Sequence, residues 1–172
     1  MHTIRTQNIK GGIIMSQIVL ARVDDRLIHG QVMTAWLQYT EGNHIVIIDD
    51  ATAKDDFLKS IMSMSVPQGI KLDVLSVAEG PDFLKEEHGN DKLLLLAKTP
   101  KAFLDLVNAG VKIDKVVIGG MGANPQRKKF YKNISASDDE KAIMQKLIDA
   151  GVDVKIQIVP SDGATDVKNL LK

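Results

Sequence analysis

The sequence is defined first by what it lacks. It contains no cysteine, which excludes disulfide frameworks and cysteine-ligated metal sites and suits a reducing cytosol. Its 22 lysines and arginines balance 22 aspartates and glutamates, so there is no basic field to collect nucleic acid or an anionic membrane. No apolar run approaches the roughly 20 residues that a bilayer-spanning helix needs. We therefore expect a cytoplasmic protein with no nucleic-acid partner and no membrane span.

What remains has the make-up of one ordinary domain. The chain has 172 residues, of which 44% are hydrophobic and 26% charged, enough to bury a core. Residues 1–14 lack the sustained apolar centre of a signal peptide. Lys10-Gly11-Gly12 is also what a ribosome-binding sequence would encode if it were translated in frame before a start at Met15. We expect one domain over residues 15–172, with 1–14 an N-terminal extension, a tag or a mis-assigned start.

Short β-branched runs alternate with longer segments of helical period. Most of these runs are apolar on both faces, as expected for strands covered by helices on both sides. The pattern predicts an α/β fold with an open, mostly parallel sheet, helices on both faces and a site loop after the first strand. The predicted strands are 18–23, 44–48, 71–75, 93–97, 115–118 and 154–159.

Helix signals divide the segments between these strands. Ser137 and Glu140 have the spacing of a capping box. The spacing of Phe57, Leu58, Ile61 and Met62 predicts one buried stripe, and we place the methionines of this segment in the core. Residues 119–136 are weakly patterned and predict a loop with a short hairpin.

Three polar groups follow predicted strands at the edge where ligands bind in open parallel sheets. They are residues 24–29 after the first strand, Asp49-Asp50 after the second and 119–122 after the fifth. If these strands are neighbours, the three groups share one pocket.

His29 stands at the start of a segment of helical period, with Gly30 after it. The free N–H groups of a helix start attract anions and favour the neutral, nucleophilic imidazole. A phosphoryl group on His29 would have its charge met by these N–H groups and by Arg22 or Arg26, and Gly30 would leave room for its approach. An aspartate, Asp24 or Asp25, could orient the ring.

Other interpretations stay open at this point. His29 could simply bond Asp25 in a solvated turn, and Arg127 with its neighbouring lysines could be a solvated hairpin or could help to hold phosphate or an acidic partner. Paired Asp24 and Asp25 are also typical of a receiver-like phosphoacceptor signalling domain, although the aspartate expected after the third strand is missing. Metal ligand spacings and nucleotide-binding glycine motifs are absent, so we expect no metal and no cofactor. His2, His44 and His88 are assigned to tail, strand edge and surface.

The segment from Ala21 to Val32, ARVDDRLIHGQV, closely resembles the active-site segment of the IIB proteins of the mannose and sorbose family of the bacterial sugar phosphotransferase system. The resemblance continues through residues 49–50, 98–100, 119–121 and 134–137 and covers residues 16–172. It implies an open α/β fold and a protein-phosphohistidine–sugar phosphotransferase. It also implies that His29 takes a phosphoryl group on Nδ1 from a phosphorylated IIA protein. His29 then gives this group to a sugar imported through the IIC and IID membrane subunits. Contact with these subunits is the only membrane association that the resemblance implies.

Within this interpretation each nearby residue receives an expected role. Asp25 orients the ring, and Arg22 and Arg26 neutralise the transferring phosphoryl group. The remaining residues are expected to bind phosphate or a partner: Asp24, Gly30, Asp49, Gly119, Gly120 and Arg127. Of these, Gly119 and Gly120 are expected to offer backbone N–H groups.

Overall fold

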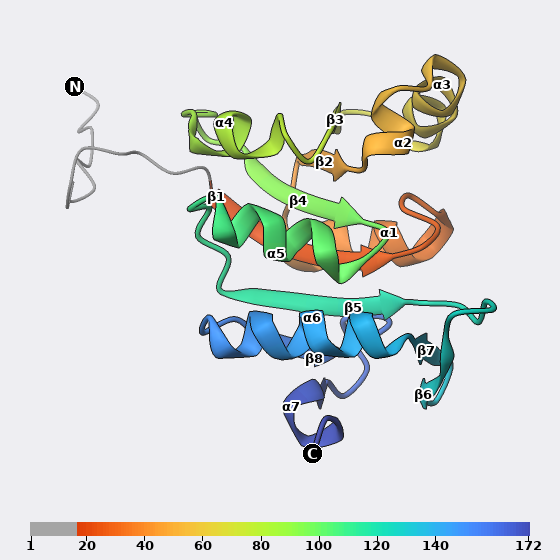
Figure 1. Ribbon diagram of the computed structural model, residues 1–172. Coiled ribbons are helices and arrows are strands. Elements are labelled where there is room, and N and C mark those ends of the chain that lie inside the picture. Colours follow the sequence, from red (N-terminus) through yellow and green to blue (C-terminus); the bar gives the residue numbers. More distant parts are fainter. Residues whose placement is uncertain (1–16) are drawn as a thin grey trace.

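The computed structural model describes residues 17–172, so the predicted boundary at Met15 and His2 lie outside the described residues. Within that range, seven strands form one mostly parallel sheet in the order β3-β2-β4-β1-β5-β8-β9, and Figure 1 shows its layers. The short edge strand β9 runs antiparallel to β8. This confirms the predicted fold class. The strands are β1 Gln17–Asp24, β2 His44–Ile48, β3 Lys71–Leu75, β4 Lys92–Ala97, β5 Lys115–Gly120, β8 Asp153–Ile156 and β9 Thr165–Asp166.

Helices cover both faces of the sheet, as predicted. Core residues from α1, together with the half-buried Met62 of α3, pack against one face, and core residues from α4, α5, α6 and α7 pack against the other. The helices are α1 Gly30–Thr40, α2 Asp50–Ala53, α3 Asp56–Ser65, α4 Gly80–Lys85, α5 Pro100–Asn108, α6 Asp138–Asp149 and α7 Val167–Leu170. Within residues 17–172, no helix is both long and apolar enough to cross a bilayer.

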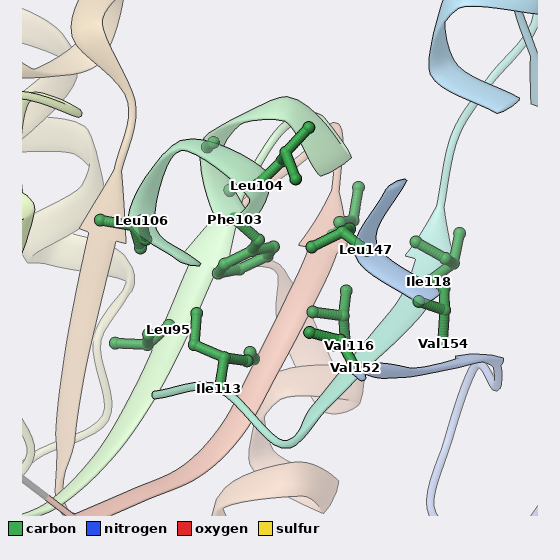
Figure 2. Packing of buried hydrophobic residues seen from close by; sticks show 14 of the residues in the cluster. Leu95, Phe103, Leu104, Leu106, Ile113, Val116, Ile118, Leu147, Val152 and Val154 are labelled. Atoms are coloured by element: carbon green, nitrogen blue, oxygen red, sulfur yellow. The ribbon is translucent and has the colours of Figure 1, made fainter. Parts of the chain in front are cut away.

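Alternate side chains of the central strands enter two separate cores. In β4, Leu94 and Leu96 pack under α1, whereas Leu95 packs under α5 on the opposite face. Figure 2 shows the second core, where Phe103 of α5 and Leu147 of α6 lie over the sheet. Full burial of each large apolar side chain contributes about 1.5–3 kcal/mol, which explains why these strands are apolar throughout.

The strand order places β1 at the centre of the sheet, between β4 and β5. Its carboxyl end, and those of β4 and β5, point to the edge where the hairpin of β6 (Lys128–Tyr131) and β7 (Ile134–Ala136) lies (Figure 1). The predicted hairpin between 119 and 136 is therefore confirmed. The loop after β1 leaves the sheet at this edge, between the ends of two neighbouring strands.

Two local predictions were wrong. The strand predicted over 154–159 ends at Ile156, because the carbonyls of Gln157 and Ile158 accept hydrogen bonds from the side chains of Arg22 in β1 and Trp36. The predicted buried stripe on α3 includes no fully buried residue, since this helix covers the edge of the sheet at β3. Phe57 is 73% exposed and the nearby Met64 is 78% exposed, so neither belongs to the core.

Candidate active site

The loop after β1 turns through two residues with left-handed backbone conformations. Leu27 has φ 56° and Gly30 has φ 40°. The side chains of Leu27 and Ile28 are buried in the core under α1, which offsets the strain of a left-handed leucine. A Cβ at Gly30 would meet nothing within 4 Å, so glycine is favoured here by its positive φ and not by lack of space. The space beside Gly30 is open, as predicted. The apolar centre of the loop thus anchors its polar ends.

His29 is the residue directly before α1, with extended φ and ψ of −148° and 130°, which confirms the predicted helix start. Its Nε2 lies 3.1 Å from Oδ2 of Asp24, and 22% of its side chain is exposed. No hydrogen bond joins Nδ1 to any side chain that the structure describes. The ring is therefore held at one nitrogen and open at the other.

Asp24 is the aspartate that contacts His29, and the expectation that Asp25 orients the ring was wrong. The Asp24 carboxylate is buried and accepts from the Arg26 backbone N–H and Nε at 3.1 Å each and from Arg22 Nη2 at 3.3 Å. Burial acts to raise the pKa of Asp24, but the hydrogen bonds from Arg26, the charge of Arg22 and the bond to His29 together hold it below its ordinary value. Asp24 is therefore an ionised acceptor.

The two arginines of the loop occupy different depths. Arg22 is 1% exposed, donates to the carbonyl of Gln157 at 2.9 Å and lies over the ring of Trp36 at 5.5 Å. Burial lowers the pKa of Arg22 from its ordinary value, and the neighbouring Asp24 opposes that shift. Arg22 therefore lies behind Asp24, and the expectation that it contacts a phosphoryl group directly was wrong. Arg26 is 57% exposed and remains available for such a contact.

The two glycines that end β5 make room for buried charged groups. A Cβ at Gly119 would come within 1.9 Å of the Arg22 guanidinium carbon, and one at Gly120 within 2.7 Å of an Asp24 carboxylate oxygen. Both residues belong to β5, which pairs with β1 and β8. Both glycines therefore have a steric role, since any larger residue here would displace the Arg22–Asp24 pair. Their expected N–H donation to phosphate stays a prediction.

Asp25 points to the hairpin side of the loop. Its Oδ2 accepts the backbone N–H of Gly122 at 2.7 Å, and Arg127 Nη1 donates to both of its oxygens at 2.8 and 3.0 Å. Arg127 also donates to Glu140 from Nε and Nη2, and its side chain is only 6% exposed. The expectation that Arg127 binds phosphate was therefore wrong, because its donors face two carboxylates.

Asp49 is separated from His29, because β4 lies between β1 and β2. Its carboxylate accepts the backbone N–H of Thr52 at 2.9 Å, capping α2, and forms an ion pair with Lys98 at 3.1 Å. A cavity of about 560 Å³ lies beside Asp49, and none of its lining residues belongs to the loop at 24–30. The three groups predicted to share one pocket therefore divide: those after β1 and β5 meet, and Asp49 stands apart.

Two charged arrangements were not predicted from the sequence. Glu140 was identified only as a capping residue, which it is, since Ser137 and Glu140 form a capping box at the start of α6. The same carboxylate is also the second partner of Arg127. His44 was assigned to a strand edge, yet it is buried between Asp73 and Asp91. Neither pairing could be found locally, because the partners are distant in sequence.

Comparisons with known proteins agree with this geometry. The model of the family described as PTS system sorbose subfamily IIB component matches residues 18–172. The chain is 32% identical over 151 residues to the sorbose-specific EIIB component of Lacticaseibacillus casei, covering 87% of this chain and 92% of the relative. It is 31% identical over 159 residues to the fructose-specific EIIB component of Bacillus subtilis, covering 92% and 98%. The crystal structure of the IIBSor domain of the sorbose permease from Klebsiella pneumoniae superposes with a TM-score of 0.84 at 30% identity, covering 90% of this chain and 96% of that one.

Proposed function

The chain belongs to the sorbose subfamily of IIB components of the sugar phosphotransferase system, and on that premise we propose that Nδ1 of His29 carries the phosphoryl group. As a IIB component, the protein is a phosphocarrier, a protein-phosphohistidine–sugar phosphotransferase that transfers phosphoryl groups to imported sugars. This family excludes the receiver-like alternative. Asp24 and Asp25 also diverge toward different arginines and do not form a shared site.

The observation that carries the assignment is the 3.1 Å contact between Nε2 of His29 and Asp24. An ionised carboxylate accepts the Nε2 proton, so the lone pair of the neutral ring is on Nδ1. Nδ1 is also the nitrogen that no described side chain occupies. The same hydrogen bond can persist after transfer, because phosphorylation of Nδ1 leaves the Nε2 proton in place.

Two in-line displacements complete the cycle. In the first, the Nδ1 lone pair of His29 forms a bond to phosphorus while the bond to the donor histidine of a IIA protein breaks and its electron pair returns to that ring. In the second, a sugar hydroxyl releases its proton to water and bonds to phosphorus, and the electron pair of the N–P bond returns to Nδ1. The partners are thus phospho-IIA and then a sugar presented by the IIC and IID subunits.

In this proposal, exposed hydrogen-bond donors stabilise the negative charge of the phosphoryl group. Arg26 lies beside Asp24 with most of its side chain in solvent, and the first N–H groups of α1 follow His29 directly. Arg22 acts one layer deeper by keeping Asp24 ionised and in place. Transfer then proceeds by positioning and electrostatics, which supply most of the catalysis of phosphoryl transfer.

The assignment is tested by labelling with radioactive phosphoenolpyruvate, enzyme I, HPr and the cognate IIA protein. Wild type and the matched control His88→Gln should take up acid-labile phosphate, while His29→Gln should take up none. The His88 ring is hydrogen-bonded to the carbonyl of Phe83, and both residues are distant in sequence from the loop after β1. Replacing His88 should therefore leave that loop intact. Persistent label on His29→Gln would exclude His29 as the phosphorylated residue.

A further inference from the structure

We propose that Arg127 is a positioning residue for phosphoryl transfer: it holds and neutralises Asp25, so that Asp24 alone presents a carboxylate to His29. This inference rests on the proposed role of His29. Because the Arg127 side chain is almost fully buried, it acts through the loop and touches neither the phosphoryl group nor a docked partner.

The guanidinium of Arg127 is shared between two carboxylates. Its Nη1 donates to both oxygens of Asp25 at 3.0 and 2.8 Å, and its Nε and Nη2 donate to Glu140 at 2.7 to 3.1 Å. Glu140 is itself fixed, since it accepts the backbone N–H of Ser137 at 2.9 Å in the capping box of α6. A planar group that donates to two carboxylates from three nitrogens is an arrangement that arginine makes and lysine does not.

The anchor behind Arg127 is rigid, and the loop in front of it is strained. Helix α6 is packed into the core through Met144 and Leu147, so Glu140 has a fixed position. Asp25 belongs to the loop that contains the left-handed Leu27, and its backbone N–H donates to the Gly120 carbonyl at 2.9 Å. A strained loop keeps its shape only where its surroundings hold it, and here Arg127 is the tether between the loop and α6.

Arg127 also removes a negative charge from the vicinity of the phosphoryl group. Asp25 is 35% exposed and directly follows Asp24, the hydrogen-bond partner of His29, so an unpaired Asp25 would repel a bound phosphoryl anion. The hydrogen bonds to Glu140, followed by those to Asp25, raise the pKa of Arg127 above its ordinary value, in agreement with a firmly held cation. The structure thus separates two neighbouring aspartates: one serves His29 and the other is neutralised.

The experiment measures single-turnover transfer from phospho-IIA at increasing donor concentration. Arg127→Ala should lower the maximal transfer rate by roughly ten- to a hundredfold, the scale expected when a reacting group is displaced slightly. The donor concentration for half-maximal rate should stay within about twofold of wild type, because Arg127 does not contact the partner. Labelling should still reach completion on His29. The matched control Lys146→Ala, on the exposed side of α6, should match wild type.

A double variant separates positioning and charge from simple packing. Arg127→Ala with Asp25→Asn removes the unpaired carboxylate, so it should transfer at least about threefold faster than Arg127→Ala alone. If Arg127→Ala does not fold, Arg127→Lys provides the test, with a lowered maximal rate and an unchanged half-maximal concentration. A wild-type rate in Arg127→Ala, a change confined to the half-maximal concentration, or a double variant no faster than the single one overturns the inference. Those outcomes leave His29 as the phosphocarrier, whereas label on His29→Gln would remove that role itself.

Discussion

Two histidines lie at opposite ends of the parallel strands, and they differ in how many of their ring nitrogens face a carboxylate. His29 follows the carboxyl end of β1 and faces one aspartate through Nε2. His44 begins β2 and faces two, with Nε2 2.6 Å from Asp73 and Nδ1 3.1 Å from Asp91. A ring nitrogen that is hydrogen-bonded to a carboxylate is already engaged. The first ring therefore has one nitrogen clear of carboxylates, as the proposed attack on phosphorus requires, and the second has none.

The surroundings of the two rings differ in the same sense. The His44 side chain is 5% exposed and has edge-to-face contacts with Phe83 and His88. His29 is partly open, and its neighbour Gly30 leaves empty space beside it. Asp24 is supported by two arginines, whereas Asp91 is supported by Lys71 at 2.9 Å. The first arrangement suits the proposed transfer of a phosphoryl group, and the second ties together β2, β3 and the segment before β4.

The largest predicted effect comes from removing the single carboxylate that orients His29. Asp24→Asn should lower the rate of phosphoryl transfer by about a hundredfold or more, because an amide can donate to the ring and permits the wrong tautomer. Rapid-quench measurement of transfer from phospho-IIA checks this. A rate equal to that of wild type would show that the Nε2 contact is not needed.

The variant Asp24→Asn should also change how the free energy of unfolding depends on pH in the acid range. Because the folded pKa of Asp24 lies below its ordinary value, its contribution to stability is complete above the ordinary aspartate pKa of about 3.9 and is lost as the pH falls below it. Urea unfolding of Asp24→Asn should therefore lose less stability than wild type between neutral pH and that acid range. An identical acid dependence in the two proteins would contradict an ionised, well-bonded Asp24.

A smaller effect is expected at the other histidine, and it should concern stability alone. His44→Gln removes two charge-assisted hydrogen bonds from a buried position and should lower the free energy of unfolding by about 2 kcal/mol. His29→Gln should change it by no more than about 0.5 kcal/mol, since Asp24 keeps both arginines. Urea unfolding compares the two, and labelling should show that folded His44→Gln still accepts phosphate. Loss of labelling in that variant would break the contrast.

The sequence predicted the sheet and the position of His29, because both depend on local patterns. Continuous apolar runs fixed the strands, and helical period after residue 30 placed the histidine at a helix start. The choice between Asp24 and Asp25 was also within reach. Arg22 and Asp24 are two residues apart on one strand and so face the same side of the sheet, the side that α1 covers. This alternation favours Asp24 over Asp25 as the partner of His29.

Other features could not be predicted, since they depend on long-range packing. Asp25 meets Arg127 across 102 positions of the chain, and nothing in either segment identifies the other. Gly119 and Gly120 have the pattern of a phosphate loop, but they end β5 and make room for the side chains of Arg22 and Asp24. Phe57 was predicted to be buried from helical spacing, but spacing does not tell how far a helix extends beyond the sheet edge.

The most direct test of the central claim is nitrogen NMR of the ¹⁵N-labelled, phosphorylated protein. Long-range proton–nitrogen correlations should assign the phosphorus-coupled nitrogen to Nδ1 of His29, with Nε2 still protonated and bonded to Asp24. The spectrum of His44 should be the same before and after phosphorylation. Phosphorus coupling to Nε2 of His29, or to either nitrogen of another histidine, would contradict the account.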